Sequence, residues 1–234
     1  MRSNKEAEMT EAALAYAHTA GQTVRARLAA VAGIASAVAF LIGIAVLNVP
    51  TKATDTELVQ WWSESSHQLE ALVSMISFTT AGLLFVVFLA HLRTRLAAAE
   101  GGAGTLTNIV SHAGLLFVAM LFVSATARGV IAYALKSPAA GEPLPGVDML
   151  RYLPQISYVV LGFCGLLSAA VAIAVTSLLS FRTRVFDRIV AWLGVVCAAS
   201  LVLANVLLIG VAAIPAMLLW TVAISVALWR TDAR

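Results

Sequence analysis

Long apolar stretches constrain the fold of this chain more than any other feature. One runs from Leu28 to Val49 and ends at Pro50, and another runs from Ala71 to Ala90 without a charged residue. A helix needs about 20 mostly apolar residues to cross the roughly 30 Å of hydrocarbon in a bilayer. Of the 234 residues, 61% are hydrophobic and only 12% are charged, against about 25% charged in a typical soluble domain. The sequence therefore predicts an all-α, polytopic membrane protein with short loops.

Six transmembrane helices are expected. The stretch between Arg188 and Arg230 contains no charged residue, and a single helix of that length would measure about 60 Å, twice what a bilayer needs. Gly210 and Pro215 interrupt helices and lie near its middle, so two spans with a tight connection are expected. The connection is apolar, which leaves open whether 189–229 forms two full spans or includes a re-entrant segment. Pro154 is expected to open the fourth span, because the first turn of a helix tolerates proline.

The expected organisation is one transmembrane domain (25–230) between an N-terminal tail (1–24) and a short C-terminus (231–234). Its spans cover about residues 28–49, 71–92, 106–135, 153–181, 189–209 and 212–229.

Arginine marks one side of the membrane. Arg-x-Arg occurs at 25–27, 93–95 and 182–184, whereas the connections 50–70 and 136–152 carry most of the acidic loop residues. Lys and Arg accumulate in short cytoplasmic loops. Six spans place the three pairs on one side together with Arg230, so both termini are expected in the cytoplasm. The basic residues lie at the ends of apolar stretches and form no continuous basic face, which argues against nucleic-acid binding.

Among the polar residues within the spans, two are candidates for contact with a headgroup or solute. Arg128 is the only Lys or Arg inside a span, and a charge at such a position is costly and often functional. Its side chain is expected to extend to the outer membrane edge or to pair with Glu70; binding of an anionic headgroup or substrate is the alternative. Asn205 lies one turn from the Gly210–Pro215 break, and it is expected either to hold helices together or to contact a solute.

The 50–70 connection carries two further signals. Thr54-x-x-Glu57 resembles a capping box, which predicts a short amphipathic helix at the outer interface. This helix is expected to serve as an interfacial anchor; the alternative is a lid over a cavity or a docking surface for a partner. Glu64-x-x-His67-x-x-Glu70 places an imidazole between two carboxylates at helical spacing. It is a weak metal-site candidate, since a di-iron bundle needs further carboxylates inside the spans. We expect no metal and no cofactor.

Small residues recur at a spacing of four on two spans, which lets helices approach closely, either within the chain or between chains. The two cysteines are expected to be small packing residues. The small-residue faces consist of Ala29, Gly33 and Ala37 on the first span and of Ser168, Ala172 and Thr176 on the fourth; the cysteines are Cys164 and Cys197.

Three segments resemble a family of uncharacterised six-helix membrane proteins common in actinobacteria, a domain of unknown function. They are Leu47-Asn48-Val49-Pro50, the stretch Ala97-Ala98-Ala99-Glu100-Gly101-Gly102, and residues 185–194. The resemblance implies a six-helix fold in a bacterial plasma membrane. It implies no activity and no functional residues.

The loops are too short for a catalytic domain, and no acidic residue lies within a span. We therefore expect no enzymatic activity. The expected function is that of a structural or accessory subunit, packed in the bilayer against a larger membrane complex or in a homo-oligomer. The alternative is a small transporter or channel for a lipid-like or small solute.

Overall fold

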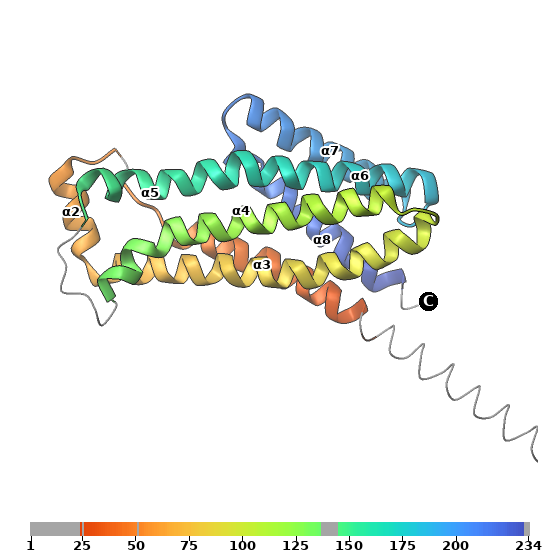
Figure 1. Ribbon diagram of the computed structural model, residues 1–234, viewed down its shortest axis with the longest axis horizontal. Coiled ribbons are helices and arrows are strands. Elements are labelled where there is room, and N and C mark those ends of the chain that lie inside the picture. The colour runs from red at the N-terminus through yellow and green to blue at the C-terminus, as the bar shows by residue number, and fades with distance from the viewer. Residues whose placement is uncertain (1–23, 25, 51, 137–144, 232–234) are drawn as a thin grey trace, which may run out of the picture.

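The protein is a bundle of long helices (Figure 1). The computed structural model describes residues 24, 26–50, 52–136 and 145–231, and this part of the chain contains helices and no strand. Six of its helices are long and apolar enough to cross a membrane. The protein is thus an all-α, multi-pass integral membrane protein. The tail 1–23, most of the third connection (137–144) and residues 232–234 lie outside the described residues.

The second and fourth spans extend beyond the apolar stretches that predict them, whereas the first and fifth end three residues earlier than expected, at Val46 and Val206. Hydropathy detects the part of a helix that lies in hydrocarbon, whereas polar residues with good helix propensity continue the helix past it. The spans are Ala26–Val46, α3 (Ser65–Glu100), α4 (Thr105–Lys136), the composite Val147–Thr183, α7 (Arg188–Val206) and Gly210–Arg230. A short helix, α2 (Asp55–Ser63), precedes α3.

The fourth span differs from its expected form. It consists of α5 (Val147–Val159), a π-helical segment η1 (Val160–Gly165) and α6 (Leu166–Thr183). Pro154 lies inside α5 and does not open the helix, so that expectation is wrong. The residues before Pro154 continue the helix outward and bury Leu150 against α2 and its neighbours, and this packing offsets the hydrogen bond that proline removes.

The last two spans form a hairpin at the Gly210–Pro215 break. A 3-10 turn, η2 (Gly210–Ala213), joins α7 to α8 (Ile214–Thr231). The turn lies against Gly162, because a Cβ added to Gly210 would stand 2.7 Å from the Gly162 carbonyl oxygen. Gly162 precedes Thr183, the end of α6, by 21 residues or about 31 Å of helix. The hairpin is therefore about as long as a bilayer is thick, which matches two full spans.

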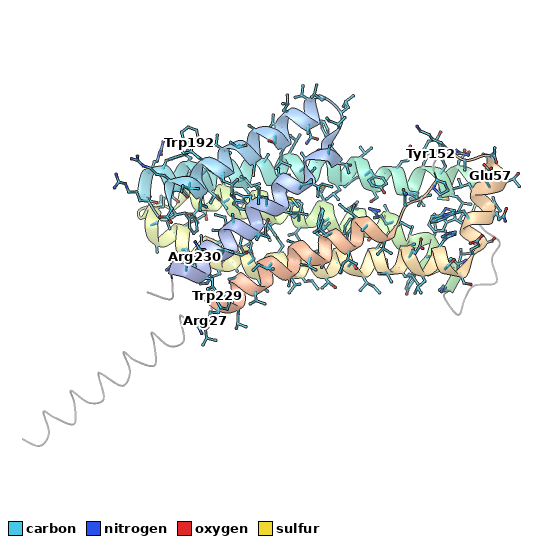
Figure 2. All side chains as sticks on the ribbon, turned by 180° about the vertical axis from the view of Figure 1, so that it is seen from behind. Arg27, Glu57, Tyr152, Trp192, Trp229 and Arg230 are labelled. Carbon is cyan, nitrogen blue, oxygen red and sulfur yellow. The ribbon has the colours of Figure 1, made fainter. Side chains whose placement is uncertain are left out.

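Both ends of the transmembrane domain lie at the same end of the bundle. The Arg27 guanidinium is 5.6 Å from the ring centre of Trp229. Figure 2 shows Arg27, Trp229 and Arg230 at one end, and Glu57 of α2 at the other. This agrees with an even number of spans.

Two hydrophobic cores follow one another along the bundle. The larger lies among the spans and includes Phe78, Phe88 and Trp220. The smaller lies under α2, where Trp62 and Leu58 are fully buried with Leu150 of α5. In Figure 1 the α7–α8 hairpin ends near the middle of the molecule, whereas α3, α4 and α5 continue toward α2. The smaller core thus belongs to an outer extension of the bundle beyond the hairpin.

The helix α2 forms as its capping box predicts. The Thr54 hydroxyl accepts a hydrogen bond from the Glu57 N–H, and the Glu57 carboxylate accepts one from the Thr54 N–H at 2.8 Å. Arg151 of α5 then fixes α2 in place, because its guanidinium bonds the Asp55 carboxylate at 2.7 Å and the Ala53 carbonyl at 3.0 Å. The apolar side of α2 packs against the smaller core and covers this end of the bundle.

Candidate functional site

Arg128 is buried at the junction of the two cores. Its side chain is 1% exposed. One of its nitrogens, Nη2, donates to the Leu47 carbonyl and to the Tyr158 hydroxyl, both at 3.2 Å. The rings of Phe78 and Tyr158 flank the guanidinium, with their centres 5.0 Å and 4.8 Å from its carbon. These contacts hold the side chain between the helices, so it neither pairs with Glu70 nor extends out of the bundle toward the membrane edge, and that expectation is wrong.

The positive charge of Arg128 has no carboxylate partner among the described residues. A guanidinium stays protonated in proteins. Partial compensation comes from the two aromatic faces and from the Leu47 carbonyl, which lies just past the C-terminus of the first span, where the helix dipole is negative. Dipoles and aromatic rings therefore stabilise the charge, and no carboxylate of the described residues neutralises it.

The guanidinium also has spare hydrogen-bond donors. Its Nε and Nη1 atoms are buried and have no partner in the described part of the chain. Together they carry three of the five N–H groups of an arginine. A buried donor without a partner costs about 1–3 kcal/mol, so this arrangement is unfavourable unless an acceptor occupies the site. An anion supplies both the acceptors and the missing negative charge.

A cavity opens on the other side of Tyr158. It has a volume of about 320 Å³ and lies where the fourth span meets the tip of the α7–α8 hairpin. Asn205 provides a second unpartnered polar atom here: its amide nitrogen donates to the Leu201 carbonyl of its own helix at 2.9 Å, and its buried Oδ1 has no partner. Asn205 therefore does not connect two helices. The remaining lining is mostly apolar: Val159, Gly162, Phe163, Leu208, Gly210 and Val211.

Irregular backbone surrounds this cavity. The π-helical segment η1 lies on one side and the 3-10 turn η2 on the other. Leu208, at the tip of the hairpin, adopts a left-handed conformation with φ of 58°, which is uncommon for a residue other than glycine. π-helical segments occur frequently at functional sites, and broken helices line the substrate sites of many transporters. The backbone thus marks the same place as the unpaired polar atoms.

The depth of the site follows from helix geometry. Tyr158 lies one turn beyond Gly162, and Gly162 lies about 31 Å from the end of α6. With that end at one surface of the bilayer, the guanidinium of Arg128 lies close to the other surface, at the level where hydrocarbon gives way to headgroups.

The metal candidate of the 50–70 connection is not supported. Glu64 separates α2 from α3 and lies outside both helices, so the three side chains do not share one helical face. The His67 ring stacks on Trp61 with ring centres 4.2 Å apart, and its Nδ1 lies 2.9 Å from the Trp61 carbonyl. No group of three His, Cys, Asp or Glu side chains in the described residues is placed to hold a metal.

The small-residue faces are used inside the chain. All six residues are buried, and a Cβ on Gly33 would collide with Ser225 of α8 and Phe88 of α3. They therefore serve close packing among the spans of one molecule. Of the cysteines, Cys197 is buried as expected, whereas Cys164 is exposed. Cys164 belongs to η1 beside the exposed Phe163 and does not pack in the core.

Sequence reasoning missed the partners of Arg128. Phe78 and Tyr158 come from two other spans and Leu47 directly follows the first span; these partners lie 50, 30 and 81 residues away along the chain. Nothing in the local pattern links them to Arg128. A signal does exist for Tyr158, since a tyrosine in an apolar helix needs a partner for its hydroxyl when it is buried.

Comparisons of the chain with models of protein families, with curated proteins and with solved structures found no match.

Proposed function

We propose that this integral membrane protein binds an anionic, partly apolar solute at Arg128 and works as a small transporter for it. The observation that carries the proposal is the buried guanidinium with unpartnered Nε and Nη1 atoms and no carboxylate beside it in the described residues. A structural arginine normally has its donors satisfied. One that retains spare donors in a place sheltered from water is suited to an anion.

The neighbouring cavity supports the second part of the description. Its lining is largely apolar and Asn205 is its main polar contributor, so it suits the apolar body of a solute. Tyr158 touches both regions, because it lines the cavity and bonds Arg128. A rotation of the Tyr158 side chain would join the cavity to the guanidinium. This makes Tyr158 the gate in the proposed mechanism.

A binding measurement with a fluorescent fatty acid and its methyl ester tests the proposal. The two probes share the apolar body and differ in the negative charge. Wild-type protein in nanodiscs is expected to prefer the acid. Arg128→Gln is expected to weaken binding of the acid by roughly 10- to 100-fold, since hydrogen bonds to charged groups contribute about 1.5–3 kcal/mol, and to leave the ester unchanged.

Lys52→Gln is the matched control, because it removes one positive charge on the same side of the membrane from an exposed position that does not contact Arg128. It should bind the acid as the wild type does. Equal affinity of the wild type for acid and ester would contradict the proposal. If binding is confirmed, uptake of the acid into vesicles that contain wild-type or Arg128→Gln protein tests the transport step.

A second candidate function is that of an accessory subunit in a membrane complex, and one surface feature supports it. An apolar groove of about 800 Å³ runs between α6 and α7 and has an alanine-rich floor: Ala170, Ala174, Ala198 and Ala199. Its size and its small side chains suit a transmembrane helix of a partner protein. Ala199→Trp fills the groove, so it should prevent a partner from co-purifying in mild detergent, whereas Ala119→Trp, at an exposed position on α4, should not. Co-purification unaffected by Ala199→Trp would remove this candidate.

The location in the membrane is part of the proposal. The concentration of Arg-x-Arg pairs at one end of the spans supports cytoplasmic termini. The family resemblance supports a bacterial plasma membrane.

A further inference from the structure

A second cavity, lined by two arginines, lies at the opposite end of the bundle from α2. It has a volume of about 520 Å³ and sits between the α6–α7 connection and the last turns of α8. Arg184 lines it from the connection and Arg230 from α8. Figure 2 shows Arg230 at the same end of the molecule as Trp192. This end carries the arginine pairs, so it is the end expected to face the cytoplasm.

The two arginines lie at helix ends and have no acidic partner among the described residues. Arg184 ends α6 in a left-handed conformation with φ of 57°, which turns the chain sharply toward α7. Neither Arg184 nor Arg230 forms an ion pair with a described residue, although Asp187 also lines the cavity. The site therefore has a net charge of +1 when its two arginines and one aspartate are counted.

The floor of this cavity is apolar. Leu193 of α7 and Ala223 and Val226 of α8 contribute to it. Both helices are membrane spans, so the cavity lies where the hydrocarbon of the bilayer meets the headgroups. A free inorganic anion gains nothing from contact with apolar side chains. A lipid, in contrast, would place its acyl chain against them and its headgroup between the arginines. Basic pockets between spans on the cytoplasmic side are a known means of holding anionic headgroups.

We infer that this cavity holds an anionic phospholipid of the cytoplasmic leaflet, with its phosphate between Arg184 and Arg230 and an acyl chain between α7 and α8. This lipid site is separate from Arg128, which lies on α4 at the junction of the two cores, near the far tip of the α7–α8 hairpin. It would anchor the α7–α8 hairpin, whose far tip forms one wall of the cavity beside Tyr158.

Native mass spectrometry of the detergent-solubilised chain tests the inference, with phosphatidylglycerol, phosphatidylcholine and inorganic phosphate as probes. Phosphatidylglycerol is expected to bind more tightly than phosphatidylcholine. Arg184→Gln combined with Arg230→Gln should weaken phosphatidylglycerol binding by about 30-fold, because each arginine near a lipid surface contributes about 1 kcal/mol. Arg93→Gln combined with Arg182→Gln is the control, since both residues are exposed, lie on the same side and do not line the cavity.

A second variant tests the apolar floor without a change of charge. Ala223→Phe fills the floor and should also weaken phosphatidylglycerol binding, while the Arg184→Lys and Arg230→Lys pair keeps the charge and should retain the preference. An equal loss in the control pair would show general attraction to a basic surface and overturn the inference. Displacement of the lipid by millimolar inorganic phosphate would identify a free-anion site and overturn it as well. Neither result depends on Arg128.

Discussion

The contact between Gly162 and Gly210 provides a sharp test of the fold around the proposed site. The two glycines face each other where η1 meets η2, but the contact is not symmetrical. A Cβ on Gly210 would lie 2.7 Å from the Gly162 carbonyl oxygen and 3.2 Å from its carbon. A Cβ on Gly162 would meet only the Val211 side chain at 3.7 Å and its nitrogen at 3.9 Å. The same substitution, glycine to alanine, should thus have opposite effects at the two positions.

The magnitudes follow from this geometry. Because the atoms that a Cβ on Gly210 meets belong to backbone, they cannot move aside as a flexible side chain can. Gly210→Ala should therefore cost about 1–3 kcal/mol, as overpacking does. At Gly162 the distances are ordinary van der Waals contacts. Gly162→Ala should be neutral or stabilise the protein by up to about 1 kcal/mol, because alanine restricts the unfolded chain and favours helix.

Thermal unfolding in mild detergent, followed by tryptophan fluorescence, measures both variants. With about 2–4 °C per kcal/mol for a chain of this size, Gly210→Ala should lower the melting temperature by roughly 2–12 °C. Gly162→Ala should leave it unchanged or raise it slightly. Similar melting temperatures for the two variants would refute the reasoning, because the close backbone contact would then not exist. A loss of stability in Gly162→Ala alone would refute it too.

Three more predictions concern other parts of the chain. In a variant without native cysteines, an impermeant thiol reagent added outside intact cells should label a cysteine at Ser65 and not one at Ala98; the reverse pattern would invert the topology. The capping-box hydrogen bonds lower the pKa of Glu57, so its stabilisation is complete above the pKa of the unfolded chain and is lost as pH falls through the lower folded value. Glu57→Gln should therefore flatten the fall of the melting temperature between about pH 5 and about pH 3, and an unchanged slope would contradict this. Ser74→Ala removes a buried bond of 2.5 Å to the first span and should cost about 1 kcal/mol in thermal unfolding, whereas the exposed Thr79→Ala, bonded within its own helix, should cost less.

The features that could be predicted from the sequence are those with a local cause. Hydropathy located the six spans, because residence in hydrocarbon demands an unbroken apolar stretch. The break near Gly210 followed from residues that interrupt helices. The start of α2 followed from Thr54 and Glu57, which satisfy each other's hydrogen bonds within one turn.

The features that could not be predicted depend on contacts between distant parts of the chain. The outer ends of α3, α4 and α5 continue past the bilayer because they build a second core around Trp62, and hydropathy contains no information about such a core. The burial of Arg128 and the unpartnered Oδ1 of Asn205 both depend on which helices pack against these side chains. The continuation of α5 through Pro154 is a further case, because packing outweighed a strong local preference.

The two cores together explain how a charge can be buried at Arg128. Phe78 belongs to the core of the spans and Leu47 to the outer core, and Arg128 contacts both. At this level the guanidinium avoids the middle of the bilayer, where a charge costs most. The outer core and α2 shield it from water, which strengthens its attraction for an anion because the local dielectric constant is low. A charge at this position attracts an anion that enters past Tyr158, and it destabilises the fold less than the same charge at the middle of a span would.

The shielding by α2 can be tested with Arg151→Ala, which removes the contacts that hold α2 in place. The variant should admit water and weaken binding of the fatty-acid probe, although Arg128 itself is unchanged. Unchanged affinity in a folded Arg151→Ala protein would show that shielding plays no part.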